Sequence, residues 1–247
     1  MDNKIYKSTV LGSISGGLGY VLTLPLDAIK QNIQSGTLNK QNNIKNYFKG
    51  GILGVTSIAP QMAIKFTTNT YLENNYKFNP LFNGFIAGLL DGAFLGPILA
   101  SQSLQQMNNK LTYKESFKII KNKSLLQMSI PMALRNAIYT SVLIGGYKLI
   151  PNKKHTTGWS CIIQDLYYAS LLNIPATLLC SPADVIRAKQ TKFLLENKDI
   201  SFLKISKSIY EEQKLKGFFK GYSMLYINFA LRFPLTLTIF NYLNKQF

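Results

Sequence analysis

The sequence is poor in acidic residues, histidine and cysteine, and each shortage argues against a class of protein. Its 247 residues contain 11 acids, two cysteines and a single histidine. The two cysteines, Cys161 and Cys180, lie far apart in apolar surroundings and form neither a disulfide framework nor a zinc site. His155 lies in a polar segment, which disfavours histidine-based catalysis. With no glycine-rich phosphate loop and no paired nucleophile and base, we expect a protein that is not an enzyme and has no metal or cofactor.

Positive charge and hydrophobicity are what the chain does have. The net charge is +17, hydrophobic residues make up 47% of the chain, and only three of the 28 bases are arginine. Such a charge suits nucleic acid, anionic lipid or an anionic substrate as partner. A nucleic-acid-binding protein would not need long apolar segments, so we expect no nucleic acid partner.

Six apolar segments of membrane-spanning length can be drawn along the chain. They cover residues 9–34, 51–73, 82–106, 129–149, 164–191 and 221–243. Gly, Pro, Ser or Asn interrupts each segment, as expected for helices with lipid on one face and a wet cavity on the other. A soluble protein with buried helices is the alternative that composition leaves open.

The lysines favour the membrane interpretation, because most of them gather in alternate connections. The first, third and fifth connections hold Lys40, Lys45, Lys49, Lys110, Lys114, Lys118, Lys121, Lys123, Lys189, Lys192, Lys198, Lys204, Lys207, Lys214 and Lys216. The other two connections hold only Lys77, Lys153 and Lys154. Positive residues thus collect on one side of the membrane, as the positive-inside rule requires. With six spans, both termini share the opposite side.

Short motifs recur along the chain and predict three repeats. The stretch "PLDAIK" at 25–30 returns as "PADVIR" at 182–187, and "YFKGG" at 47–51 returns as "FFKGY" at 218–222. A weaker middle copy, "PILASQSLQQ", begins at Pro97 and has Leu99 and Gln102 in place of the acid and the base. We expect repeats of two helices each over residues 1–80, 81–160 and 161–247.

These motifs, Pro-x-Asp-x-x-Lys/Arg followed by aromatic-Lys-Gly, resemble the mitochondrial carrier family over nearly the whole chain. The resemblance implies an all-α membrane protein, with six transmembrane helices in pseudo-threefold symmetry around a central cavity. It implies alternating-access transport of a small metabolite across the mitochondrial inner membrane, with both termini in the intermembrane space. It also implies a monomer in the lipid bilayer, with cardiolipin near Gly50 and Gly221. The short length, the lysine skew and the eroded motifs are similar to a giant-virus-encoded member of the family.

The resemblance assigns a matrix-side gate to the odd-numbered helices, whose prolines bend the helices inward. The gate residues are Pro25, Asp27, Lys30, Gln34, Pro97, Gln102, Gln106, Pro182, Asp184 and Arg187. The family pattern predicts an ion pair between Asp184 and Lys30. It also predicts a hydrogen bond between Asp27 and Gln102, and leaves Arg187 facing Leu99 without an ionic partner.

The opposite gate departs further from the family, which has aromatic-acid pairs near the ends of the even helices. The aligned dipeptides here are Asn69-Thr70, Tyr147-Lys148 and Phe240-Asn241, which contain no acid. We therefore expect a second gate held by packing and neutral hydrogen bonds.

Alignment with the family's substrate contact points selects Ser57, Arg135, Asn136 and Asn228. Helical spacing adds Lys65, Tyr139 and Arg232 on the same helix faces. Three bases without partners in a cavity would demand an anion, and arginine suits phosphate or carboxylate. Asp91, in the third apolar segment, is either a coupling acid or the structural partner of a lysine, and we favour the partner.

Two substrate classes compete. Nucleotides are favoured by the number of bases and by Tyr20 or Tyr139 as a surface for the ring. A di- or keto-carboxylate is favoured by the Arg135-Asn136 pair, because within the family an arginine followed by a small polar residue is typical of carboxylate carriers. We lean to nucleotide exchange on the base count. A channel or membrane scaffold without exchange activity is the alternative of another class.

Overall fold

Every regular element in the described residues of the computed structural model is a helix. The structure describes residues 3–36, 47–48, 50–76, 78–108, 110–121, 125–150, 159–196, 198 and 201–246. The long rods are α1 (Asn3–Ser35), α2 (Gly51–Tyr76), α3 (Pro80–Met107), α7 (Trp159–Leu195), α9 (Tyr222–Gln246) and a composite of α5 (Leu125–Thr140), the π-helix η2 (Ser141–Gly145) and α6 (Gly146–Leu149). Each rod contains one predicted apolar segment.

The distribution of side chains is that of a membrane bundle rather than a soluble protein. Within the described part of the chain, three segments are long and apolar enough to cross a membrane, namely Val10–Ser35, Pro80–Met107 and Tyr167–Leu195. Large apolar side chains such as Leu22 and Phe94 are 64% and 70% exposed on the outside of the bundle, while Lys30 is 1% exposed inside it. Large apolar side chains thus face outward and charged ones inward, which fits a membrane bundle and not the soluble alternative.

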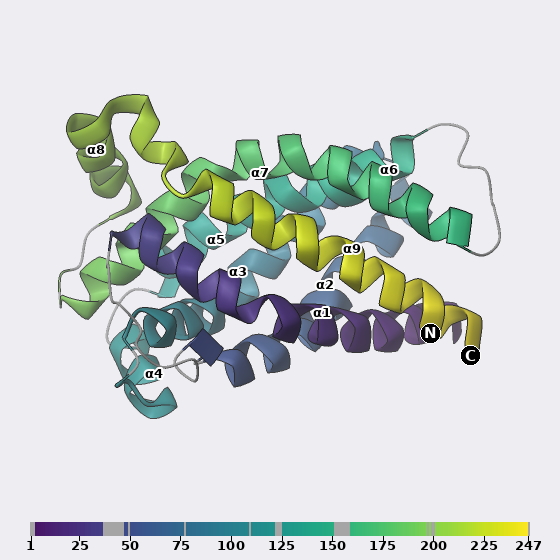
Figure 1. The fold of residues 1–247 in the computed structure, drawn as a ribbon, viewed down its shortest axis with the longest axis horizontal. Coiled ribbons are helices and arrows are strands. Elements are labelled where there is room, and N and C mark those ends of the chain that lie inside the picture. The colour runs from purple at the N-terminus through teal and green to yellow at the C-terminus, as the bar shows by residue number, and fades with distance from the viewer. Residues whose placement is uncertain are drawn as a thin grey trace.

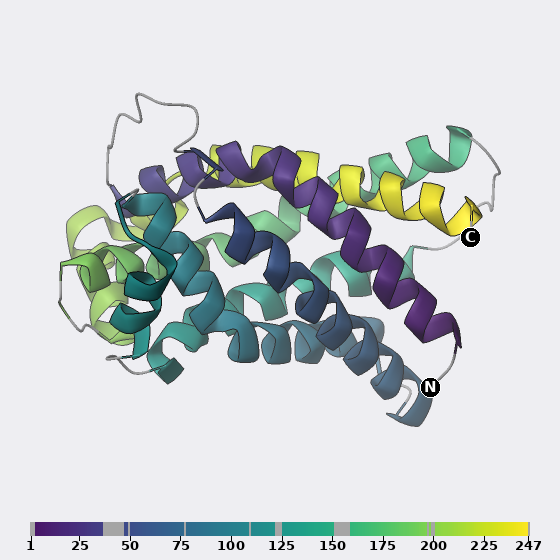
Figure 2. The ribbon, with the colours of Figure 1, turned by 90° about the horizontal axis from the view of Figure 1, so that it is seen from below.

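The rods form a closed ring. Each contacts the next one round, from α1 to α2, α3, α5, α7 and α9, and α9 returns to α1 (Figures 1 and 2). Pro25, Pro97 and Pro182 lie inside the continuous helices α1, α3 and α7. Figure 2 shows α1 bending along its length. The ring agrees with the predicted six-helix architecture around a central cavity, whereas the boundaries of the three repeats stay a prediction.

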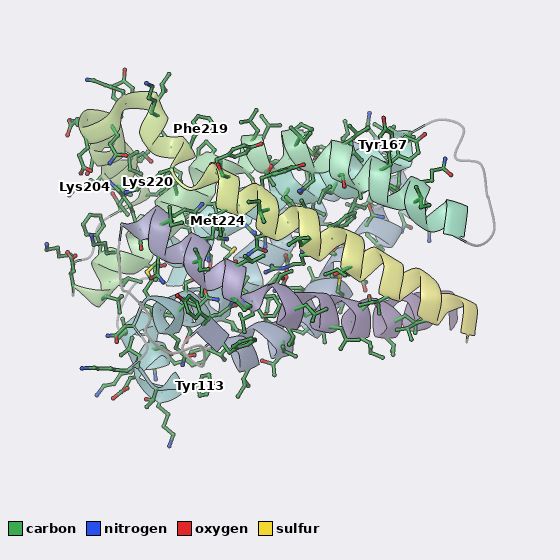
Figure 3. The ribbon with its side chains drawn as sticks, viewed as in Figure 1. Tyr113, Tyr167, Lys204, Phe219, Lys220 and Met224 are labelled. Carbon is green, nitrogen blue, oxygen red and sulfur yellow. The ribbon has the colours of Figure 1, made fainter. Side chains whose placement is uncertain are left out.

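The short helices and the termini lie at opposite ends of the bundle. The helices α4 (Tyr113–Lys121) and α8 (Phe202–Gln213), with the 3₁₀ turn η3 (Lys214–Phe219), lie at one end, and both chain termini lie at the other (Figure 1). Figure 3 shows Tyr113 of α4 and Lys204 of α8 at that same end. The lysines of α4, α8 and η3 therefore share one end, as the sequence predicted. Lys40, Lys45, Lys49, Lys77, Lys123, Lys153 and Lys154 lie outside the described residues.

Two glycines give the first and last thirds of the chain the same local geometry. Gly50 and Gly221 have φ of +77° and +74°, a region that L side chains rarely adopt. Each carbonyl accepts a hydrogen bond of 3.0 Å from the amide four residues on, at Gly54 and Leu225. Both glycines thus turn the chain into an even-numbered rod, α2 or α9, in the same way.

A stripe of glycines lets α3 approach α5 closely. Gly84, Gly88, Gly92 and Gly96 recur every four residues and face the backbone of α5 or the start of η2. A Cβ on Gly84 would lie 2.8 Å from the carbonyl oxygen of Thr140, and one on Gly96 would lie 2.7 Å from Cα of Ser129. Small residues at such positions allow membrane helices to pack backbone to backbone.

Replacing Gly88 by valine should therefore push α3 away from α5. A Cβ there overlaps the carbonyl of Asn136, and overpacking of this kind typically costs about 1–3 kcal/mol or more. We expect a clearly lower unfolding temperature for the purified protein. Gly17→Val is the matched control, because a Cβ there meets nothing within 4 Å. Equal losses in the two variants would contradict close packing along the stripe.

Candidate functional site

The three odd-numbered rods bring their motifs together in one buried cluster of charges. Lys30 Nζ on α1 lies 3.2 Å from Asp184 Oδ2 on α7. The lysine and the acid are 1% and 0% exposed, so the pair closes one end of the ring to solvent. The ion pair predicted from the sequence is present.

Asp27 is the second acid of this gate cluster and is held by α1 and α3 together. Lys30 Nζ lies 3.2 Å from its Oδ1. Gln106 and Gln102 donate hydrogen bonds of 3.2 and 3.4 Å to its Oδ2, so the predicted contact with Gln102 is also present. Gln102 donates a further bond to the Tyr20 hydroxyl. Amides of α3 thus replace the base that the family pattern would have there.

The prediction that Arg187 lacks an ionic partner is wrong. Its Nη2 lies 3.3 Å from Asp184 Oδ1, one turn earlier on α7. Its Nη1 donates a hydrogen bond of 2.8 Å to Ser103 Oγ on α3. Comparison with the neighbouring helix alone overlooked this partner, although an acid and a base three residues apart on a helix are neighbours.

Gln34 on α1 is the counterpart of Gln106 on α3, because its side chain interacts with the gate acid Asp184 as that of Gln106 does with Asp27. Gln34 is fully buried and packs against Gly221 at the start of α9. The Thr191 hydroxyl donates a 3.0 Å bond to the carbonyl of Arg187 in its own helix.

A cavity of about 370 Å³ lies inside the ring. Its walls come from every long rod and run along α1 from Gly12 to Lys30, which is about 27 Å at the helical rise of 1.5 Å per residue. The gate cluster forms its closed end, and the partly exposed Lys148 lines the other end. The cavity is thus deep and single-ended, and it reaches most of the way across a bilayer core.

The structure corrects the prediction of three unpaired bases, because an acid contacts each of them. Lys65 Nζ lies 3.0 Å from Asp91 Oδ2. Arg135 Nε lies 3.3 Å from Asp184 Oδ1, and Arg232 Nη2 lies 3.9 Å from Asp27 Oδ1. The acids come from odd rods and the bases from even ones, so sequence spacing did not reveal the pairs.

Asn136 joins two of these pairs into one network. Its amide nitrogen donates a 2.8 Å bond to Asp91 Oδ2, and its Oδ1 accepts a 2.6 Å bond from Arg135 Nη1. Asp91 is 0% exposed and contacts Lys65, in agreement with the structural-partner interpretation. Polar contacts therefore run without a break from Lys65 to the gate cluster.

Sequence reasoning missed Phe229, whose ring lies at the centre of the cations. The guanidinium carbons of Arg135 and Arg232 lie 5.0 and 5.6 Å from its centroid, and Lys30 Nζ lies 5.7 Å away. Tyr139, a predicted contact residue, packs its ring 4.5 Å from the same centroid. Cations over an aromatic face are attracted by the ring quadrupole. The sequence feature that could have indicated Phe229 is its position directly after Asn228, a predicted contact residue.

The remaining predicted contact residues lie in or beside the cavity, but their polar atoms already form hydrogen bonds within the protein. Asn228 is fully buried and donates a 3.4 Å bond to Asp27 Oδ1, so it belongs to the gate cluster. The Ser57 hydroxyl donates to the carbonyl of Gly54 on its own helix and accepts from Gln61. We therefore regard Ser57 as the least available of the predicted ligands.

Comparisons with known proteins agree with this architecture. No family model matches the chain. A mitochondrial aspartate-glutamate transporter of Saccharomyces cerevisiae is 23% identical over 93% of this chain, which spans only 30% of that transporter's length. A glutamate/glycine mitochondrial carrier of Schizosaccharomyces pombe is 21% identical, over 96% of this chain and 93% of the carrier. A mitochondrial carrier-like protein of Acanthamoeba polyphaga mimivirus is 23% identical, over 98% of this chain and 97% of its own.

These relatives are members of the mitochondrial carrier family, and the chain is similar to them over nearly its whole length. Identity at this level does not specify a substrate, but coverage from end to end agrees with the ring of helices and the convergent motifs.

At the open end of the carrier, an ion pair corrects the prediction of a purely neutral gate. Lys148 Nζ on α6 lies 2.6 Å from Glu73 Oε2 on α2. Glu73 lies three residues beyond Thr70, so comparison of the aligned dipeptides alone overlooked it. Asn69 is buried, and Tyr147 lines the cavity. The side chains of Thr70, Phe240 and Asn241 lie outside the described ones.

Reversing both charges of the Lys148–Glu73 pair is expected to recover the small stability loss that a single charge change causes. Lys148→Glu places two carboxylates together, and exposed pairs of this kind are worth only about 0.2–1 kcal/mol. We expect a small drop in unfolding temperature for Lys148→Glu and recovery in the double variant Glu73→Lys with Lys148→Glu. A double variant less stable than either single one would argue against direct contact.

Proposed function

We propose that this carrier exchanges a small dicarboxylate by alternating access. Support comes from the charge balance of the cavity and the gate cluster. The described residues there include six cations, Lys30, Lys65, Lys148, Arg135, Arg187 and Arg232, and the carboxylates that contact them are four, Asp27, Asp91, Asp184 and Glu73. An excess of two positive charges in a low-dielectric cavity favours a ligand with two negative charges.

The correction of the unpaired bases moves our preference from nucleotides to carboxylates. The nucleotide prediction depended on three free bases, and each of them has an acid partner. A nucleoside diphosphate would bring about three negative charges, nearly two of them on its terminal phosphate, which exceeds the excess of two positive charges. The names of two relatives, an aspartate-glutamate transporter and a glutamate/glycine carrier, also point to small carboxylates.

Nucleotide exchange remains the second candidate because of the aromatic residues beside the arginines. Arg232 lies 4.7 Å from the ring centroid of Tyr20, and Arg135 lies 5.9 Å from that of Tyr139. Such rings offer stacking surfaces to a base. Because the rings already contact the arginines, a nucleotide would have to displace one of these contacts.

We propose that the carrier works in the mitochondrial inner membrane as a multi-pass protein. The lysine-rich end with α4 and α8 would face the matrix, since positive residues favour that side. Both termini would then lie in the intermembrane space. The gate cluster would be the matrix-side gate, closed here, and the cavity would open toward the intermembrane space.

A panel of ligands tests the proposed function. Purified protein is heated with malate, oxoglutarate, aspartate, glutamate, ADP or dATP, and a ligand that binds only the folded state raises the unfolding temperature. We expect stabilisation by malate or oxoglutarate, followed by their uptake into proteoliposomes that are preloaded with the same compound. Stabilisation by nucleotides alone would favour the second candidate. Uptake that is independent of preloading would indicate a channel.

A further inference from the structure

The fourth rod, composed of α5, η2 and α6, keeps one face toward the cavity as far as the open end. The lining side chains recur in steps of four residues, as the pairs Arg135 and Asn136, Tyr139 and Thr140, Leu143 and Ile144, and Tyr147 and Lys148. Each residue of an α-helix turns about 100°, so three steps of four residues would turn the last pair about 120° away from the first. A regular α-helix would therefore have carried Tyr147 and Lys148 off the cavity face.

The second rod, α2, shows the drift that a regular helix produces. Ser57, Gln61 and Lys65 line the cavity at the same four-residue step. Among the described residues of α2, the lining ends there: Asn69, one step on, is buried outside the cavity wall, and the Glu73 side chain is 51% exposed. Since α2 is a continuous α-helix, the longer lining of the fourth rod needs a local cause.

The π-helix η2 is that cause, because its hydrogen bonds close one residue later than those of an α-helix. Among the described residues, η2 is the π-helical segment of the ring. The extra residue takes back about 100° of the rotation, which returns the last lining pair to the face of the first. The amide of Gly146 donates to the carbonyls of Leu143, Val142 and Ser141 together. Hydrogen bonds of the α and π types therefore coexist at the end of η2.

The first turn of α3 selects the π-helical arrangement. Gly145 lies against this turn, where a Cβ would lie 2.6 Å from Cα of Leu81 and 2.6 Å from the carbonyl oxygen of Pro80. Ser141 Oγ donates a 2.8 Å bond to the carbonyl of Leu81. If η2 became α-helical, each later residue would take the place of the residue that follows it, so Ile144 would occupy the place of Gly145. An isoleucine does not fit against the backbone there unless the first turn of α3 moves away.

We propose that the surplus residue of η2 gives the open end of the fourth rod two registers. In the π register of this structure, Tyr147 and Lys148 line the cavity, and Lys148 contacts Glu73. In the α register, Tyr147 takes the place of Lys148, and Lys148 turns about 100° away from the cavity. The contact between Gly145 and the first turn of α3 thus controls which side chains form the open end of the cavity wall. This inference goes beyond the proposed function, because it depends on neither the substrate nor the direction of transport.

Two neighbouring glycines give a matched test of the registers. Cross-linking by a short bifunctional thiol reagent is compared for Glu73→Cys with Lys148→Cys and for Glu73→Cys with Tyr147→Cys, in a full chain whose two native cysteines are replaced by alanine. Gly145→Ala adds a Cβ that overlaps the backbone of α3, so we expect the ratio of 73–147 to 73–148 cross-links to rise several-fold. Gly146→Ala is the control and should leave the ratio unchanged, because its Cβ would meet only a leucine side chain, at 3.1 Å. Equal ratios in the two variants would overturn the proposal.

Deletion of Val142 tests whether η2 carries a surplus residue, and it decides the question if Gly145→Ala does not fold. Removal of a surplus residue leaves a regular α-helix with the later side chains in place. We therefore expect a folded protein that keeps the 73–148 cross-link and loses the 73–147 one. Insertion of one alanine after Val142 is the matched control, which turns every later residue by about 100° and should abolish the 73–148 cross-link. A deletion variant that does not fold, or that loses the 73–148 cross-link as the insertion does, would overturn the proposal.

Discussion

Replacing Asp184 by alanine is expected to cause the largest loss of stability among single changes in the gate cluster. The side chain is 0% exposed and contacts Lys30, Arg135 and Arg187. Its removal raises the excess of positive charge in the site from two to three. Lys30 keeps Asp27 at 3.2 Å, but its second buried ion pair is broken, and breaking a buried pair by removing one partner typically costs about 3–5 kcal/mol. We expect a steep fall in the unfolding temperature or in the yield of folded protein.

Replacing Lys30 as well should recover part of the stability that Asp184→Ala loses. The double variant Asp184→Ala with Lys30→Ala returns the excess to two charges and removes a lysine that would otherwise lie buried. Glu211→Ala, on the exposed face of α8 where the side chain is 62% exposed, is the matched control and should change little. Simple addition of the Asp184 and Lys30 losses would contradict a direct ion pair between them.

Arg135→Ala should abolish exchange while the protein stays folded. Arg135 lies at the junction of the cavity, the Asn136–Asp91 network and the gate cluster. A truncated side chain offers the anion no guanidinium, and each tenfold loss in rate corresponds to about 1.4 kcal/mol of transition-state stabilisation. We expect exchange to fall by at least tenfold, measured as uptake of labelled substrate into preloaded proteoliposomes.

Surface lysines provide the control for this loss. Lys207→Ala on α8 removes one positive charge where the side chain is 78% exposed, and exchange should be unchanged. Circular dichroism and unfolding temperature establish whether Arg135→Ala is folded. Normal exchange by folded Arg135→Ala would remove this residue from the substrate site.

Several parts of the site could be predicted because they depend on short-range pattern. Each apolar segment became a long rod, and "PLDAIK" and "PADVIR" placed Asp27, Lys30 and Asp184 at one end of the ring. Helical spacing alone would also have paired Arg187 with Asp184. The error there came from comparison with the family pattern, which looked only to the next helix.

Pairs between distant segments could not be read from spacing. Lys65 and Asp91 lie in different rods, as do Arg135 and Asp184, and Arg232 and Asp27. Periodicity gives the face of a helix on which a residue lies, but not the residue that faces it from the neighbouring helix. Phe229 was missed for the same reason, since an aromatic residue in an apolar segment is ordinary until three cations surround it.

The sequence by itself determined the six apolar segments, the lysine-rich end and the recurring motifs, because these features are local along the chain, and the ring of helices was an expectation from the family resemblance. Only the tertiary structure decided how the charges are shared. In a low-dielectric interior, the energetic effect of a charged side chain depends on which group contacts it, and the number of charges alone does not give that effect. The sequence therefore predicted correctly that Lys65, Arg135 and Arg232 line the cavity. The packing of α1, α5, α7 and α9 decided that Arg135 and Arg232 also contact the acids of the gate cluster.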